Sequence, residues 1–359
     1  MAMLKVVKRP QASGAKQILY RLISVIIAIL CSALIIGLMG YNPVEIFKKI
    51  IEGSTMTAYR LTETVKRAIP LTILSLGISI AFYMKFWNIG AEGQFFLGAF
   101  GAALIALNLP QLPAGVLIPL MFISGAFFGA LWALIPCIFK VKLGASETLV
   151  TLMLNYVAIK LISYLQFGPW KDPKALGFAR VEKFAGNAVL PKVFGVNAGW
   201  IIALVLMVFV YIIMRHTKLG YEIKVMGENT NTATYAGMNP VKITVIAVLL
   251  SGAICGMAGV VQASAVEKTI SDQMSGGMGF TAVITTWLAR LSAPAIVVVS
   301  LLFAMLLQGG AYIQSALQIP SSVAEVIQGI ILFFVLSSEF FIEYRIVTKQ
   351  GLEKLSQKV

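Results

Sequence analysis

The sequence consists largely of apolar blocks that are long enough to cross a membrane. A helix that crosses about 30 Å of hydrocarbon needs about 20 mostly apolar residues, because its backbone polar groups must bond within the helix. Hydrophobic residues make up 58% of the 359 positions and charged residues 12%, against about 45–50% and about 25% in ordinary soluble domains. We therefore predict an all-α, polytopic integral membrane protein.

About ten transmembrane helices are predicted, with both the N and C termini in the cytoplasm. In chain order the spans are 19–40, 68–84, 89–107, 116–139, 147–167, 200–214, 243–265, 279–291, 295–313 and 322–342. The eighth is short for a full crossing, as a broken or re-entrant helix would be. The orientation follows from the basic residues. With the N-terminus in the cytoplasm, 17 of the 29 Lys and Arg residues fall in cytoplasmic segments.

The chain is predicted to be a single transmembrane domain, residues 1–359, built from two pseudo-repeated halves. Its other segments are a basic cytoplasmic tail (1–18), an outer amphipathic connection (42–67), an external loop (168–198), a cytoplasmic loop (215–242) and a cytoplasmic tail (343–359). All are too short for a soluble catalytic domain of typical size. The net charge of +14 is therefore assigned to membrane orientation and anionic lipid, and not to nucleic acid.

Several kinds of chemistry lack their motifs. The sequence contains no G-x-x-x-x-G-K-[ST] phosphate loop, no H-E-x-x-H and no G-x-S-x-G. Cys31, Cys137 and Cys255 lie apart in apolar blocks, so we interpret them as packing residues. The single histidine, His216, lies beside basic residues at a helix end and is interpreted as interfacial. We predict no catalytic residue, no metal site and no cofactor in this chain.

Polar residues stand at the head of the third predicted span. In the string FWNIGAEGQFFLGAFGAAL, residues 86–104, Asn88, Glu92 and Gln94 are interspersed with glycines. A carboxylate at membrane depth is costly unless it faces a partner or a water-filled cavity. Glycines permit the unwound backbone from which transporters build substrate sites. A structural role is equally compatible, with Asn88 capping the helix and Glu92 complementing its positive end.

A second glycine-interrupted stretch, MSGGMGFTAVITTWLARL from residue 274, opens the eighth span. It occupies a roughly corresponding place in the second half, and paired broken segments point to a permeation path built from repeats. We therefore place Trp287 and Asn155 with Asn88, Glu92 and Gln94 as candidate residues of that path. Helix or lipid packing is the alternative for Trp287.

Two further charged residues fall within predicted spans. Lys160 lies in the middle of the fifth span, where it could snorkel, pair with Glu92 or Glu147, or face the path. Glu325 follows Ser322 in a capping-box pattern, which indicates a helix start.

The cytoplasmic loop 215–242 carries the signals of a short surface helix. Gly227 breaks a basic and apolar segment, Asn229 or Thr230 can cap the helix, and Gly237 can end it. Pro240 would then separate this helix from the next span. A capped helix between two spans can insert into a groove on a cytoplasmic partner, and an ordinary ordered loop is the alternative.

Five strings resemble the permease subunits of ABC importers for nucleosides and simple sugars. They are FWNIGAEGQFFLGAF, GASETLVTLMLNYVA, GYEIKVMGENTNTATYAGMNP, LSGAICGMAGVVQ and GFTAVITTWLARLSAP. The resemblance extends over residues 19–341, and it is closest to the longer permease of nucleoside importers fed by a basic-membrane-protein-type lipoprotein. Other members of the family carry ribose, galactose or riboflavin.

The resemblance implies a subunit of the bacterial cytoplasmic (inner) membrane that imports nucleosides or related sugars by alternating access. It implies a separate ABC ATPase subunit that binds ATP and Mg²⁺, a second permease subunit in a hetero- or homodimer, and an external substrate-binding lipoprotein. It also implies that the short helix couples to the ATPase through Gly227, Glu228, Asn229, Thr230, Ala233, Tyr235 and Gly237.

The sequence departs from the family pattern in three places. Ser146-Glu147-Thr148 stands where relatives often have N-E-V, the coupling segment is more polar at Thr232 and Thr234, and Lys160 replaces an expected apolar residue. The alternatives in other classes are an ion-coupled secondary transporter, which needs several intramembrane acids, an intramembrane enzyme, and a structural scaffold. The sequence lacks the residues that the first two require.

Overall fold

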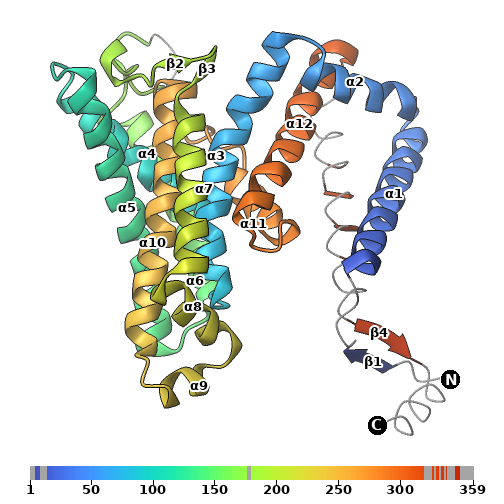
Figure 1. Cartoon of the computed structure of the whole chain (residues 1–359). Helices are drawn as coiled ribbons and strands as arrows, with labels where there is room; N and C mark the ends of the chain where they lie inside the picture. The colour runs from blue at the N-terminus through green and yellow to red at the C-terminus, as the bar shows by residue number, and fades with distance from the viewer. Residues whose placement is uncertain are drawn as a thin grey trace, which may run out of the picture. The chain divides into compact units, whose positions relative to one another are not determined.

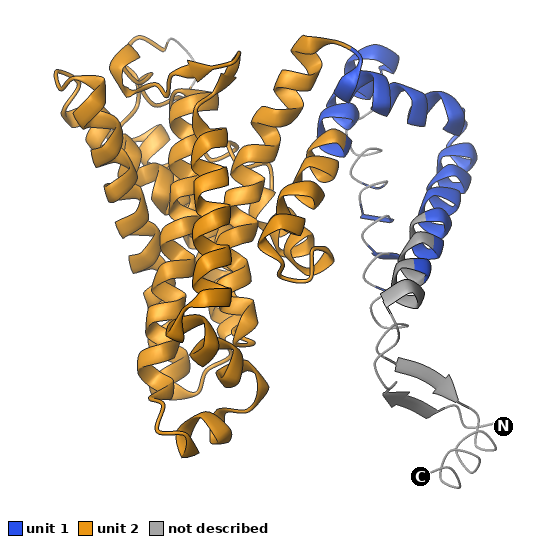
Figure 2. Cartoon of the chain, in the orientation of Figure 1, with its two compact units in different colours: residues 1–56, 306–359 blue, residues 57–305 orange. Residues whose placement is uncertain are grey.

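The computed structural model describes residues 5–8, 14–175, 179–318 and 344–347, with isolated positions between 318 and 344 (Figure 1). The chain divides into two compact units. One consists of residues 1–56 and 306–359, and the other of residues 57–305 (Figure 2).

The first unit contains two helices near the N-terminus, α1 (Gly14–Leu38) and α2 (Pro43–Thr55). It also contains an antiparallel strand pair, β1 (Lys5–Lys8) and β4 (Tyr344–Val347). The side chain of Asn42 caps α2 by accepting the Val44 N–H at 3.0 Å. A small apolar core is formed by Ile36, Ile46, Ile50 and Ile313.

The second unit holds most of the membrane-length helices. Its elements are α3 (Ala58–Tyr83), α4 (Ala91–Asn108), α5 (Ala114–Leu143), α6 (Glu147–Phe167), a 3₁₀ turn (Gly186–Ala188), β2 (Lys192–Val193), β3 (Val196–Asn197), α7 (Gly199–His216), α8 (Lys218–Glu228), α9 (Thr230–Tyr235), α10 (Pro240–Val261), a π-helical turn (Gln262–Glu267), α11 (Met278–Leu288) and the greater part of α12 (Ala293–Leu317).

Among the described residues, seven helices are long and apolar enough to cross a membrane, or eight if the bent pair α1 and α2 counts as one crossing. The helical class predicted from sequence is thus confirmed, apart from two short strand pairs, whereas ten spans are not reached. The tenth predicted span, 322–342, and the capping pattern at Glu325 lie outside the described residues.

The predicted connection 42–67 is wrong in its second half. Helix α3 begins at Ala58, ten residues before the predicted span, because Thr57 caps it by accepting the Arg60 N–H at 3.2 Å. The charged residues of its first turns include the ion pair Lys66–Glu63 at 2.6 Å. Local capping and charge pairing therefore extend the helix beyond its apolar part.

The eighth predicted span is a broken crossing. Helix α11 has only 11 residues, and residues 268–277 before it are irregular. At one end, the Lys268 carbonyl accepts the N–H of Phe184 in the external loop at 2.8 Å. At the other end, Arg290 lines a 250 Å³ cavity with Tyr83 and Arg215, at the ends of α3 and α7. An unwound stretch and a short helix together make this crossing.

The loop 168–198 and the loop 215–242 lie at opposite ends of the second unit (Figure 1). The loop 168–198 carries β2 and β3, which pair antiparallel, and the opposite end carries α8 and α9. Within the external loop, Asp172 accepts the Lys174 N–H at 2.9 Å and pairs with Arg180 at 3.0 Å. These two groups hold the pKa of Asp172 below its usual value.

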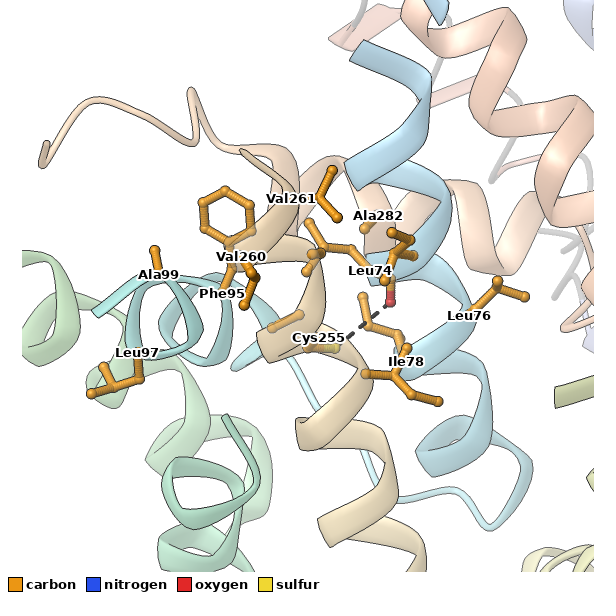
Figure 3. Close-up of a cluster of buried hydrophobic side chains, with 14 of the residues drawn as sticks. Leu74, Leu76, Ile78, Phe95, Leu97, Ala99, Cys255, Val260, Val261 and Ala282 are labelled. Carbon is orange, nitrogen blue, oxygen red and sulfur yellow. Dashed lines mark hydrogen bonds between the residues drawn. The ribbon is translucent and has the colours of Figure 1, made fainter. Parts of the chain in front are cut away.

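Helices α4, α5 and α10 pack through glycines. A Cβ at Gly98 would overlap the backbone of Gly256, and a Cβ at Gly256 would overlap the backbone of Gly125. Close approach of this kind is how membrane helices gain packing contacts without a hydrophobic driving force. Cys255 is fully buried beside this seam, with its Sγ 3.7 Å from the Leu74 carbonyl (Figure 3), so it is a packing residue as predicted.

We predict that Gly256→Ala destabilises the protein by about 1–3 kcal/mol, because the added methyl group forces the helix backbones apart. The measurement is the apparent thermal midpoint in detergent. Gly115→Ala is the matched control, since a Cβ there meets nothing within 4 Å and alanine favours the helix by about 1 kcal/mol. Equal midpoints for the two variants would contradict the close packing.

Candidate functional site

The chain between α3 and α4 unwinds inside the bundle. Residues 84–90 are irregular, and the Asn88 side-chain amide donates to Ser251 Oγ at 3.2 Å. Ser251 lies eleven residues into α10, about 16 Å from its start at 1.5 Å per residue. The Asn155 amide, eight residues into α6, donates to the Ile89 carbonyl at 2.9 Å. Helix α4 therefore begins deep within the bundle.

Asn88 and Gln94 hold the unwound segment by reciprocal hydrogen bonds. Asn88 Nδ2 donates to Gln94 Oε1 at 3.0 Å, and Gln94 Nε2 donates to Asn88 Oδ1 at 2.9 Å. Asn88 Oδ1 also accepts the Gly90 N–H at 3.1 Å. The expectation that Asn88 caps α4 is wrong, because the residue before the helix is Gly90 and Asn88 accepts no N–H from within the helix backbone. Its role is to fix the turn that leads into the helix.

Glu92 joins the starts of α4 and α11. Its carboxylate accepts the Gly279 N–H at 2.6 Å and the hydroxyl of Ser275. Glu92 lies in the first turn of α4 and Gly279 in the first turn of α11, so the positive ends of two helix dipoles both face the carboxylate. The prediction that Glu92 complements the positive end of its helix is confirmed. The two broken crossings therefore meet at one buried carboxylate.

The structure brings four of the five predicted path residues together. Asn88, Glu92, Gln94 and Asn155 are at most 2% exposed. Each makes hydrogen bonds within the protein; for Asn155 these include the Gly93 N–H at 2.8 Å. We call these four residues the mid-depth polar cluster. Their contact with a solute stays a prediction, since the cluster is closed in this conformation.

Trp287 lies apart from the cluster. It is 37% exposed, and its ring stacks on Trp87 with centroids 5.3 Å apart and an interplanar angle of 22°. Phe82, near the end of α3, packs beside it at 5.8 Å. Its predicted place in the path likewise stays a prediction.

Sequence reasoning missed the hydroxyl groups of Ser75 and Thr286 near this region. Thr286 Oγ1 donates to the Ser75 carbonyl at 3.0 Å, and the Ser75 hydroxyl bonds to Thr285. These bonds link α3 to α11, and all three residues are fully buried. Ser75 and Thr286 also donate to carbonyls of their own helices, so only the fold shows that they link two helices.

At the far end of the second unit, α9 is the short capped helix that the sequence predicts. Asn229 Oδ1 accepts the N–H groups of Asn231 at 2.9 Å and Thr232 at 3.3 Å. Gly237 has a φ of +74°, and the Met238 N–H donates to the Ala233 carbonyl at 3.0 Å, which is the bond of a Schellman end. The start and end of this helix are confirmed.

Two details of this loop differ from the prediction. Gly227 does not break a helix, because α8 continues to Glu228 and a Cβ at Gly227 would overlap the Tyr83 carbonyl. A glycine is needed at position 227 because α8 packs closely against the end of α3 there. Pro240 is the first residue of α10, where its missing N–H costs nothing, and Asn239 caps that helix by accepting the Lys242 N–H at 3.0 Å.

A cavity of about 490 Å³ adjoins the start of α9. Its walls come from the ends of α3, α5 and α8 and the starts of α6, α9 and α10, and they include Lys85, Lys140, Glu147, Gly227, Glu228, Asn229 and Thr230. Lys140 and Glu147 form an ion pair at 2.8 Å on this wall.

That ion pair bears on Lys160. Glu147 pairs with Lys140, and Glu92 is bonded to α11, so the predicted pairing of Lys160 with either acid is wrong. Lys160 is exposed on α6. Two alternatives remain for Lys160: its side chain snorkels to the membrane surface, or it faces the solute path.

Comparison with known proteins finds similarity to transport permeases. Residues 60–336 match the family described as branched-chain amino acid transport system / permease component. The glucose ABC transporter permease protein TsgB13 of Haloferax volcanii is 31% identical, with 90% of this chain and 88% of that protein covered.

Two further relatives are similar over comparable lengths. The nucleoside ABC transporter permease protein NupB of Lactococcus lactis is 29% identical, with 91% and 93% covered. The guanosine ABC transporter permease protein NupP of Bacillus subtilis is 28% identical, with 89% and 93% covered. The chain with its two broken crossings therefore belongs to this permease family, and it is a multi-pass permease of the ABC transporter class.

Proposed function

We propose that this chain is the permease of an ABC importer that moves nucleosides, or related simple sugars, into the cell across the bacterial cytoplasmic membrane. The observation that carries the proposal is the meeting of two broken crossings at Glu92, deep in a bundle of membrane-length helices. Discontinuous helices that meet near mid-depth are the usual framework of a transport site. The solute class rests on the relatives named for nucleosides, guanosine and glucose.

The driving force is assigned to a separate ABC ATPase that binds ATP and Mg²⁺. We propose that it docks on α9 and the adjoining 490 Å³ cavity. The coupling residues are Gly227, Glu228, Asn229, Thr230, Ala233, Tyr235 and Gly237. Tyr235 is 94% exposed at the end of α9, and Ala233 is fully buried beneath it. A rigid capped helix with one projecting aromatic ring suits insertion into a groove.

The remaining partners follow from the same assignment. A second permease, identical or different, completes the path, and an external lipoprotein delivers the solute to the side that carries the loop 168–198. The bilayer surrounds the helices. Permeases for ribose, galactose or riboflavin are the nearest alternatives in solute.

The mid-depth polar cluster and Trp287 are proposed to act at the path itself. Alternating access requires that one set of contacts open as another closes. The bonds of Glu92 to Gly279 and Ser275 connect the two broken crossings, so relative movement of α4 and α11 would expose this carboxylate together with Asn88, Gln94 and Asn155. An ion-coupled carrier is disfavoured, because Glu92 is the one acid among the described residues bonded at this depth.

The function is tested by reconstituting the chain with its ATPase and second permease in liposomes and measuring uptake of labelled guanosine and glucose. We expect accumulation that requires ATP on the ATPase side. Accumulation against a gradient by the chain alone, without nucleotide, would overturn the assignment to ABC transport.

We predict that Tyr235→Asp lowers ATP-driven uptake at least about tenfold, because a charged carboxylate replaces the aromatic ring at the docking surface. The fold should be unaffected, since the side chain is 94% exposed. Ala233→Pro should act similarly by removing the Ala233 N–H bond to Asn229. The control is Tyr59→Asp, an exposed tyrosine at the opposite end of the second unit. Full uptake by Tyr235→Asp in membrane vesicles would refute the coupling role.

We predict that Glu92→Ala lowers the uptake rate at least about tenfold and also lowers the apparent thermal midpoint. The substitution leaves the Gly279 N–H and the Ser275 hydroxyl buried without an acceptor, at a cost of about 1–3 kcal/mol for each group. Both quantities are measured on the purified complex. Glu182→Ala, in the exposed external loop, serves as the control. A transport rate equal to that of the unaltered protein would count against any role for Glu92.

A further inference from the structure

Helix α6 has one buried face and one fully exposed face. It packs on α4 and α5 through a side that includes Thr151, Asn155, Ala158 and Ile162. The exposed side chains are Leu149, Met153, Tyr156, Val157, Lys160, Tyr164 and Phe167. At about 100° per residue, all of them lie within about 60° of Lys160. Lys160 therefore stands at the centre of the exposed face.

The position of Lys160 along the helix makes snorkelling unfavourable. It lies thirteen residues into α6 and seven residues before its end, so the nearer end is about 10 Å away at 1.5 Å per residue. Side chains of a helix lean toward its N-terminus, which here is the farther end. The ammonium group would have to extend against this direction to reach the nearer membrane surface.

Contact with lipid or with an acid of the same chain does not account for the charge. A lysine that faces hydrocarbon within a span is costly. In the described part of the chain, no carboxylate forms an ion pair with Lys160, since the buried acids nearest in the fold are bonded to Lys140 and to α11. The exposed face is also not purely apolar, because Tyr156 and Tyr164 lie one turn to either side of the lysine and are 57% and 66% exposed.

We propose that Lys160, Tyr156 and Tyr164 line a second, water-filled part of the solute path, on the face of α6 turned away from Asn155, and contact the solute there, an inference that rests on the proposed function. An ammonium group offers three hydrogen-bond donors and no acceptor, so it recognises hydroxyl, carbonyl or anionic oxygen atoms and repels cations. The two tyrosine rings offer flat faces to a base or a sugar ring and a hydroxyl at their tips. The site thus selects neutral or anionic ring solutes that are rich in oxygen acceptors, as uncharged nucleosides and sugars are.

The first test asks whether this face is in water. In the full complex with Cys31→Ser, Lys160→Cys is treated with a charged, membrane-impermeant methanethiosulfonate in the absence of ATP. Cys137 and Cys255 are buried and stay unlabelled. The matched control is Phe127→Cys, a 60% exposed position on α5. We expect labelling of Lys160→Cys to be at least about tenfold faster than that of the control, because the reactive thiolate forms in water, and we expect saturating solute to slow it.

Two outcomes of the labelling would overturn the proposal. Equally slow labelling at both positions would place α6 against lipid. Fast labelling that solute does not slow, together with a disulfide between Tyr156→Cys and the second permease, would make this face a permease interface. Labelling needs no transport, so it remains informative even if the complex accumulates no guanosine or glucose and the proposed function fails.

The second test separates solute contact from structure. Lys160→Met should raise the KM for uptake about tenfold, as expected for one lost bond to a charged donor. Lys160→Arg should restore most of the affinity, because it keeps the charge and the donors. A KM unchanged in Lys160→Met would refute the contact, and so would an arginine variant as impaired as the methionine variant.

Discussion

The structure depends on one buried carboxylate held between two helix starts. Glu92 lies in the first turn of α4 and accepts bonds from Gly279, in the first turn of α11, and from Ser275, just before that helix. Within hydrocarbon, the free N–H groups of a helix start have no water to bond. A carboxyl group placed between two such ends accepts an N–H of one helix and lies at the positive ends of both helix dipoles. The broken crossings are possible at this depth because of that mutual compensation.

The side-chain amides around Glu92 bond to further backbone groups of the unwound segment and of the start of α4. Asn155 accepts the Gly93 N–H and donates to the Ile89 carbonyl, so one side chain of α6 serves two backbone groups of another segment. Asn88 and Gln94 bond to each other and fix the turn between them. Polar residues that a membrane would otherwise exclude are thus required by the irregular backbone that they accompany.

Much of the helical framework could be predicted from sequence, because crossing hydrocarbon imposes a length and a composition. Helix α6 begins and ends where its apolar pattern does, and α9 could be placed from Asn229 and Gly237 alone, since caps are local. The prediction places the start of α3 too late, because it follows the apolar part and leaves out two signals that are equally local, the Thr57 cap and the paired charges. The packing role of Gly227 and the partners of Glu92 depend on residues far away in the sequence, and one sequence contains no signal for such pairs. The contact of the mid-depth polar cluster and Trp287 with a solute stays a prediction.

The glycine seam of α4, α5 and α10 has a mechanical consequence. Where helix backbones touch directly, there is no layer of side chains that can switch rotamers and let one helix slide past another. The three helices must therefore move together as one solid block. Any cycle of opening and closing in this unit has to be taken up outside this block, for example between α3 and α11, which are joined by single hydroxyl bonds.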